Sequence, residues 1–81
     1  MKHEFSPRFV RSYDEAPAEI RRLFDKQLGL LLADIRHSSL RAKKYDEARG
    51  IWQARVSRTW RFYFKINGDT YYLLDIIPHP K

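Results

Sequence analysis

The sequence predicts a small α+β domain in which one long helix covers an antiparallel sheet. Apolar residues recur at helical spacing over residues 18–33, and they alternate with polar residues over residues 51–66. Asn67-Gly68 then separates the alternating segment from a second β-rich run, residues 70–77. These patterns are typical of an amphipathic helix, of strands with one face on a core, and of a two-residue hairpin. We therefore expect an N-terminal strand and a long helix packed on a β-meander, with about four strands in the sheet.

Length and composition fit one folded domain spanning residues 1–81. A chain of 81 residues that is 43 % hydrophobic and 15 % aromatic can bury a core and differs from a disordered tail. It has no cysteine, which excludes disulfides and thiolate metal sites. No apolar run approaches the roughly 20 residues of a membrane span, and no signal-peptide pattern opens the chain. We expect a cytoplasmic protein with no membrane partner.

The positive charge is concentrated in one part of the chain. The net charge is +6, and residues 36–61 account for all of it, with eight basic residues against two acidic ones. Clustered positive charge suggests a polyanion or an acidic protein as partner. A basic surface that only keeps the protein in solution explains the charge equally well.

The N-terminal segments give weaker patterns than the rest. Residues 3–10 are expected to form a strand in which Pro7 marks an edge position or a bulge. Residues 12–16 are expected to form a turn, with Pro17 in the first turn of the following helix.

The helix predicted at residues 18–33 turns an apolar stripe toward the core. The stripe consists of Ile20, Leu23, Phe24, Leu28 and Leu31. Gln27 interrupts it, and Gly29 costs about 1 kcal/mol relative to alanine, which suggests a close backbone contact. Residues 34–50 show no period, and Leu40 and Tyr45 are their expected core anchors.

The alternating segment sorts its side chains onto two faces. One face carries Trp52, Ala54, Val56, Trp60, Phe62, Phe64 and Ile66; the other carries Gln53, Arg55, Ser57, Arg61, Tyr63 and Lys65. The long helix must cover the aromatic face, because no other segment is long enough to do so. The second face then stays open, and its guanidinium groups could bind phosphate in a bidentate manner.

The last strand, residues 70–77, is apolar on both faces and is expected to lie centrally and to end at Pro78. Strict alternation puts Tyr71, Leu73, Asp75 and Ile77 on one face, and His79 continues that row. Whether this is the open face depends on the register, which the sequence does not fix.

Several stretches, in this order, resemble the RelE/ParE superfamily of bacterial toxins. They are the run from Leu31 through Arg36-His37-Ser38-Ser39-Leu40 to Lys43-Lys44-Tyr45, then Trp52-Gln53-Ala54-Arg55-Val56, Trp60-Arg61-Phe62-Tyr63-Phe64 and Ile76-Ile77-Pro78-His79. The resemblance implies a RelE-like fold and a toxin–antitoxin system in which the toxin cleaves ribosome-engaged mRNA and so inhibits translation. It implies an antitoxin, mRNA and the ribosome with its 16S rRNA as partners, and no metal or small-molecule cofactor.

The resemblance also implies roles for individual residues. Arg61 matches the arginine that stabilises the transition state, Arg55 a basic residue that holds the phosphate, and His79 a histidine used in acid–base work. Residues expected to contact RNA are Arg41, Lys43, Lys44, Arg58, Tyr63 and Lys65. Many active relatives have a tyrosine after the terminal histidine, whereas this chain continues with Pro80-Lys81, so Tyr63 is a candidate substitute. Histidine is the residue type that ordinarily changes charge near neutral pH, which favours His79 over any arginine for proton transfer.

The sequence also allows simpler interpretations of these residues. Arg61 could form a salt bridge to Asp75 across the hairpin, His79 could be a solvated terminal residue, and the lysines could be a general polyanion contact. Two other functions are also open. A ParE-like gyrase poison would not need the sheet-face arginine or the histidine, and a catalytically degenerate homologue would only bind an antitoxin.

Overall fold

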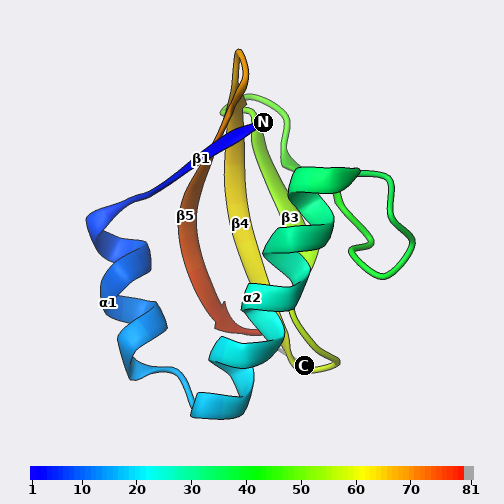
Figure 1. Ribbon diagram of the computed structural model, residues 1–81. Coiled ribbons are helices and arrows are strands. Elements are labelled where there is room, and N and C mark those ends of the chain that lie inside the picture. The colour runs from blue at the N-terminus through cyan, green and yellow to red at the C-terminus, as the bar shows by residue number, and fades with distance from the viewer. Residues whose placement is uncertain (80–81) are drawn as a thin grey trace.

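A computed structural model describes residues 1–79 of the chain, and Figure 1 shows the order of its elements. These residues form β1 (Lys2–Phe5), α1 (Pro7–Glu15), α2 (Ala18–Ala33), β2 (Lys43–Asp46), β3 (Ile51–Arg55), β4 (Trp60–Asn67) and β5 (Thr70–Pro78). The five strands make one sheet in the order β1-β5-β4-β3-β2. All neighbours are antiparallel except β1, which runs parallel to β5. The α+β prediction is confirmed, with one strand more than expected, and β5 is flanked by a strand on each side, as predicted.

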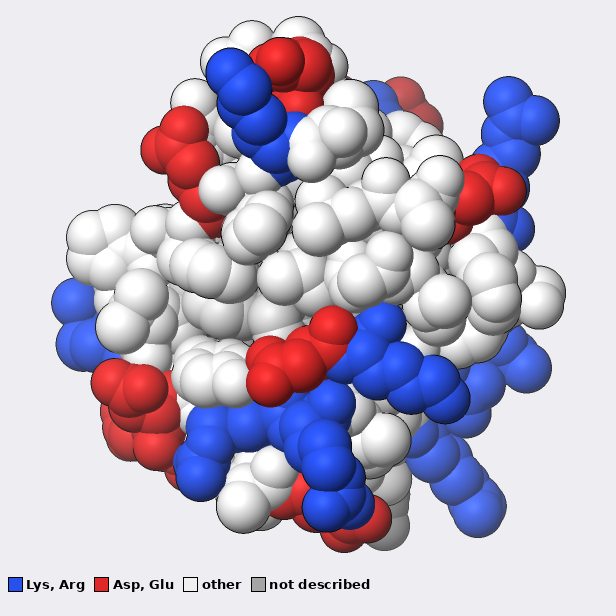
Figure 2. Space-filling view, in the orientation of Figure 1, with Lys and Arg blue, Asp and Glu red and all other residues white. Residues whose placement is uncertain are grey.

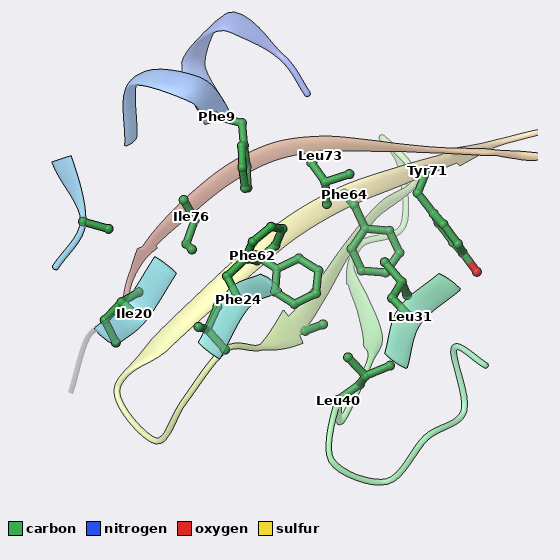
Figure 3. Close-up of a cluster of buried hydrophobic side chains, with 13 residues drawn as sticks. Phe9, Ile20, Phe24, Leu31, Leu40, Phe62, Phe64, Tyr71, Leu73 and Ile76 are labelled. Carbon is green, nitrogen blue, oxygen red and sulfur yellow. The ribbon is translucent and has the colours of Figure 1, made fainter. Parts of the chain in front are cut away.

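The hydrophobic core lies between the sheet and the two helices, which sit on the same side of it in Figure 1. Helix α2 has the predicted bounds, and its Phe24 ring meets the fully buried Phe62 ring edge-to-face at 5.1 Å. Figure 3 shows these two rings beside Phe9 and Phe64 at the centre of the cluster. The helix therefore covers the aromatic face of the alternating segment, as the sequence predicts. No helix within residues 1–79 is long and apolar enough to cross a membrane.

The strand predicted over residues 3–10 is wrong beyond Phe5, because a helix starts there. The Ser6 hydroxyl accepts a hydrogen bond from the Phe9 amide at 3.0 Å, and Pro7 occupies the first helical turn. Proline has no N–H to donate, and the first turn of a helix needs none. Helix α1 consequently continues through Glu15, where a turn was expected.

Of the two core anchors expected in the segment between α2 and β3, only one is buried. Leu40 is fully buried, whereas Tyr45 is 60 % exposed and lies on the unpredicted strand β2. Strand β2 pairs only with β3, so its residues are at the edge of the sheet and gain little burial. The Tyr45 prediction is therefore wrong, since aromatic character alone does not show on which side a strand is covered.

Two glycine predictions also need correction. The hairpin is present, but Asn67 and Thr70 pair across it and its two loop residues are Gly68 and Asp69. Only Gly68, with φ of +60°, takes the left-handed backbone, which fits a turn with glycine in its first central position. A Cβ added at Gly29 would meet nothing within 4 Å, so the suggested close backbone contact does not exist.

A β-bulge in β5 overturns the predicted facing of the last strand. Tyr63 pairs with Asp75 and Phe64 pairs with Leu73, which leaves Leu74 as an extra residue. Leu73 and Ile76 are consequently both buried in the core. An extra residue reverses the alternation beyond it. Tyr71 and Leu73 therefore face the helices, whereas Asp75 and Ile77 face the opposite side, so the four do not share one face.

Candidate functional site

The sheet face opposite the helices, here called the open face, is built from cross-strand rows. Arg55 of β3 lies opposite Arg61 of β4, which lies opposite Ile77 of β5. The next row along the strands is Lys43, Gln53, Tyr63 and Asp75. Directly opposed residues have Cβ atoms about 5 Å apart, so each row forms one continuous surface.

The open face contains a hollow of about 340 Å³, here called the cationic hollow. It is lined by Arg41, Lys43, Gln53, Ala54, Arg55, Arg61 and His79. Within residues 1–79 no carboxylate lines it, so its charge is uniformly positive or neutral. The structure thus brings together the three candidate catalytic residues and two of the six expected RNA contacts. Figure 2 views the molecule from the helix side, where basic side chains gather in the lower half and a broad central band carries no charge.

Backbone carbonyls of the loop between β3 and β4 accept hydrogen bonds from all three candidate catalytic residues. The Ser57 carbonyl accepts hydrogen bonds from Arg61 Nη1 at 2.8 Å and from Arg55 Nε at 3.3 Å. The neighbouring Thr59 carbonyl accepts one from the His79 amide at 2.6 Å. A single short loop therefore sets the positions of two guanidinium groups and of the chain end that carries the histidine.

Within residues 1–79 no carboxylate forms an ion pair with Arg55 or Arg61. In the described part of the chain Arg61 forms no ion pair, and Asp75 instead accepts a hydrogen bond from the Ile76 amide at 2.9 Å. Partial burial lowers the pKa of the Arg61 guanidinium, and the positive charges of Arg55 and Arg41 lower it further. The salt bridge between Arg61 and Asp75 is thus absent, and an anion bound between the arginines would relieve their repulsion.

Gln27 supports the site and was not anticipated from the sequence. Its side chain is only 5 % exposed, and its Nε2 donates to the Arg55 carbonyl at 2.7 Å and to the Ser39 carbonyl at 3.2 Å. Its Oε1 accepts from the Ser39 hydroxyl at 3.1 Å. Helix α2 therefore fixes the end of β3 directly. A polar residue inside an apolar stripe was the available signal, but its partners lie far away along the chain.

Arg41 enters the cationic hollow from a strained backbone position. Its φ of +47° makes it the one non-glycine residue within residues 1–79 with a positive φ. The preceding residue is the buried Leu40, whose carbonyl accepts a hydrogen bond from the Arg55 amide at 2.7 Å. This conformation costs about 1–2 kcal/mol for a residue with a Cβ. The buried neighbour and its strand contact hold Arg41 in that conformation at the rim of the hollow.

The other expected RNA contacts lie outside the cationic hollow. Lys44 points to the opposite face, with its Nζ 5.4 Å from the centre of the Trp52 ring. Arg58 lines a separate depression beside α2. Tyr63 shares the open face and accepts a hydrogen bond from Gln53 at 3.0 Å, and Lys65 lies further along β4, opposite Ile51. Pro80 and Lys81, which occupy the positions where the resemblance led us to look for a tyrosine, are outside the described residues.

Residues 1–79 contain no group of three or more histidine, aspartate or glutamate side chains that could hold a metal ion. The polar groups that line the cationic hollow are guanidinium, ammonium, amide and imidazole groups.

No protein-family model matches the sequence, and no curated protein matches it. Solved structures match it over nearly its whole length. The YoeB/ParE toxin from Agrobacterium tumefaciens has a TM-score of 0.82 at 13 % identity, covering 99 % of this chain and 100 % of that one. The RelE–RelB complex from Pyrococcus horikoshii OT3 gives 0.81 at 14 % identity, with 99 % and 96 % covered. The RelB–RelE antitoxin–toxin complex from Methanococcus jannaschii gives 0.74 at 18 % identity, with 91 % and 87 % covered. The chain has the fold of the RelE/ParE toxins, as its motifs predicted.

Proposed function

We propose that this protein is the toxin of a type II toxin–antitoxin pair and that it cleaves mRNA on the ribosome, with the cationic hollow as its active site. One observation carries the proposal. Arg55, Arg61 and His79, named from the sequence as candidate catalytic residues, line one hollow, and no carboxylate within residues 1–79 lines it with them. A phosphodiester is the ligand that such an unneutralised pair of arginines favours.

The proposed reaction uses the RNA's own 2′-hydroxyl as nucleophile. Its oxygen bonds to the adjacent phosphorus while the bond from phosphorus to the 5′-oxygen of the next nucleotide breaks. The products are a 2′,3′-cyclic phosphate and a free 5′-hydroxyl. The transition state concentrates negative charge on the non-bridging oxygens, where the guanidinium groups of Arg55 and Arg61 would bind. Because the Ser57 carbonyl holds both groups, little rearrangement is needed when that charge develops.

His79 is assigned the proton transfer in this proposal. Imidazolium can protonate the leaving 5′-oxygen, and histidine is the residue type in the hollow that exchanges a proton readily near neutral pH. The proton of the 2′-hydroxyl passes to solvent water. Arg61 does not serve as the base, because even with a lowered pKa a guanidinium stays protonated.

The proposal includes a cognate antitoxin. Two of the three structures named above as sharing the fold are RelE–RelB complexes. The net charge of +6, all of it within residues 36–61, favours an antitoxin segment that carries acidic residues and covers the cationic hollow. Binding there would block RNA directly.

Primer extension on a reporter mRNA, after induction of each variant, tests the proposal. The wild type should produce cuts at ribosomal A-site codons. Arg61→Ala should reduce cleavage by about 100- to 1,000-fold, as expected for loss of one charge-stabilising donor. His79→Ala should reduce it by about 100-fold or more. Arg22→Ala, which removes an exposed charge from α2, is the matched control and should cut like the wild type.

Four results would change the assignment. Cuts that persist in Arg61→Ala would contradict the proposed active site. Cuts lost in Arg61→Ala but retained in His79→Ala would move proton transfer away from the histidine. Growth arrest without cuts, accompanied by a DNA-damage response, would favour gyrase poisoning, and no growth defect at all would favour a homologue that only binds its antitoxin.

A further inference from the structure

A second hollow, of about 260 Å³, lies beside the cationic hollow on the open face. We call it the aromatic hollow, and it is lined by Arg8, Tyr45, Ile51, Tyr63, Leu74, Asp75 and Ile77. The two hollows are adjacent. Gln53 of the cationic hollow donates a hydrogen bond to the Tyr63 hydroxyl of the aromatic hollow at 3.0 Å, and Arg61 is the direct cross-strand partner of Ile77.

Tyr45 is the unusual residue of this hollow. It is 60 % exposed on an edge strand, although the burial of an aromatic ring is a large stabilising term for a chain of 81 residues. Its ring meets Tyr63 edge-to-face at 5.0 Å, which fixes its orientation from one side. Tyr63 is fixed in turn by Gln53. The result is an oriented aromatic ring with much of its surface available to a ligand.

Two β-bulges frame the aromatic hollow. The pairing of β2 with β3 shifts between Lys44 and Asp46, so Tyr45 is the extra residue on its strand. The pairing of β4 with β5 shifts at Leu74, the extra residue there. Both extra residues line the hollow. Bulges redirect side chains and are frequent next to binding sites. Regular pairing of either strand would not produce this surface.

We propose that the aromatic hollow binds one unpaired base of a single-stranded RNA whose phosphate lies in the cationic hollow. The base would stack on Tyr45 and rest against Ile51 and Ile77. Aromatic rings beside a positively charged groove are the usual way in which proteins hold single strands. This inference rests on the proposed function and deepens it, because it names the unstacked base as a second element of recognition.

The charges favour this occupant over a phosphate. Arg8 and Asp75 are the two charged residues that line the aromatic hollow within residues 1–79, one of each sign, so this lining has no net charge and does not select an anion. The arginines attract an anion to the neighbouring hollow, one cross-strand row away. Along a strand, two residues on the same face are about 6.7 Å apart, so a base and its own phosphate can reach the two hollows together.

Fluorescence anisotropy with a labelled single-stranded RNA hexamer, 2′-O-methylated to prevent cleavage and measured at low salt, tests the inference. Tyr45→Ala should weaken binding by between about fivefold and 100-fold, whereas Tyr45→Phe, which keeps the ring, should bind like the wild type. A second series of hexamers carries one abasic nucleotide, placed at each position in turn. At one position the missing base should weaken binding by the wild type as much as Tyr45→Ala weakens binding of the intact hexamer. The same abasic hexamer should bind Tyr45→Ala as tightly as the intact hexamer does. Because Tyr45 is largely exposed, the urea midpoint of Tyr45→Ala should match that of the wild type.

Each contrary result has a defined meaning. The inference is overturned if wild type and Tyr45→Ala bind the hexamer with equal affinity. It is also overturned if Tyr45→Phe loses as much affinity as Tyr45→Ala does. Loss of affinity for the cognate antitoxin alone would assign Tyr45 to that partner and also overturn it. No saturable binding of the hexamer by the wild type overturns it too. In every case the primer-extension assay decides the proposed cleavage on its own, so the two failures are distinguishable.

Discussion

The two faces of the sheet differ although they are made from the same strands. On β4, Phe62 is fully buried against Phe24. Its neighbour Arg61 lies on the open face, where within residues 1–79 its hydrogen bonds go to backbone carbonyls. On β3, the buried Ala54 adjoins Arg55 in the same way. One residue along a strand changes the environment from core to candidate active site. Stability and chemistry can therefore be altered separately in this protein, by substitutions at adjacent positions.

The faces also differ in regularity. The core face follows simple alternation except where the bulge at Leu74 admits both Leu73 and Ile76. The open face depends on its irregularities, which are the two bulges and the positive φ of Arg41. Regular strand pairing maximises the burial of side chains, whereas a bulge changes the direction in which an individual side chain points.

The largest effect on stability is expected at the core side of β4. Phe62→Ala should lower the free energy of unfolding by about 3–5 kcal/mol, because it leaves a cavity beneath Phe24. Arg61→Ala, one residue earlier, should lower it by less than about 1 kcal/mol, since its hydrogen bonds go to partly exposed carbonyls. Urea unfolding of both variants measures the contrast. Similar losses for the two would show that the arginine is a structural residue.

A smaller effect is expected where helix α2 contacts the end of β3. Gln27→Met keeps the shape of the side chain but removes its hydrogen bonds to Arg55 and Ser39. The unpaired carbonyls should cost about 1–3 kcal/mol in the free energy of unfolding. Amide hydrogen exchange of residues 39–41 and 55–57 should also accelerate, because these segments lose their link to the helix. Slower or unchanged exchange in the variant would mean that α2 does not hold the site in place.

Sequence patterns correctly predicted those elements whose structure depends on residues close together in the chain. The helix at residues 18–33 and the two faces of residues 51–66 follow from periodicity, and the hairpin follows from its glycine. Motif likeness named Arg55, Arg61 and His79, and the structure brings these three into one hollow. The N-terminal error was also local. Ser6-Pro7 is a helix start, and the apolar residues around it were weighed too heavily as a strand.

What could not be predicted depends on contacts between distant segments. The bulges at Tyr45 and Leu74 exist only in relation to neighbouring strands, so the facing of β5 could not be derived from its own sequence. Gln27 looked like a defect in an apolar stripe because its partners lie 12 and 28 residues away. The aromatic hollow combines four strands and one helix residue, and no single stretch of sequence indicates it.

The smallest expected effect separates backbone strain from charge at Arg41. Arg41→Ala and Arg41→Gly remove the same guanidinium from the cationic hollow, so both should weaken binding of the RNA hexamer equally and reduce its salt dependence. Only glycine adopts a φ of +47° without strain. The glycine variant should therefore be more stable than the alanine variant by about 1 kcal/mol in urea unfolding. Equal stability of the two would show that the loop relaxes once the arginine is gone. Unequal RNA binding would mean instead that the strained backbone, and not the charge alone, shapes the open face.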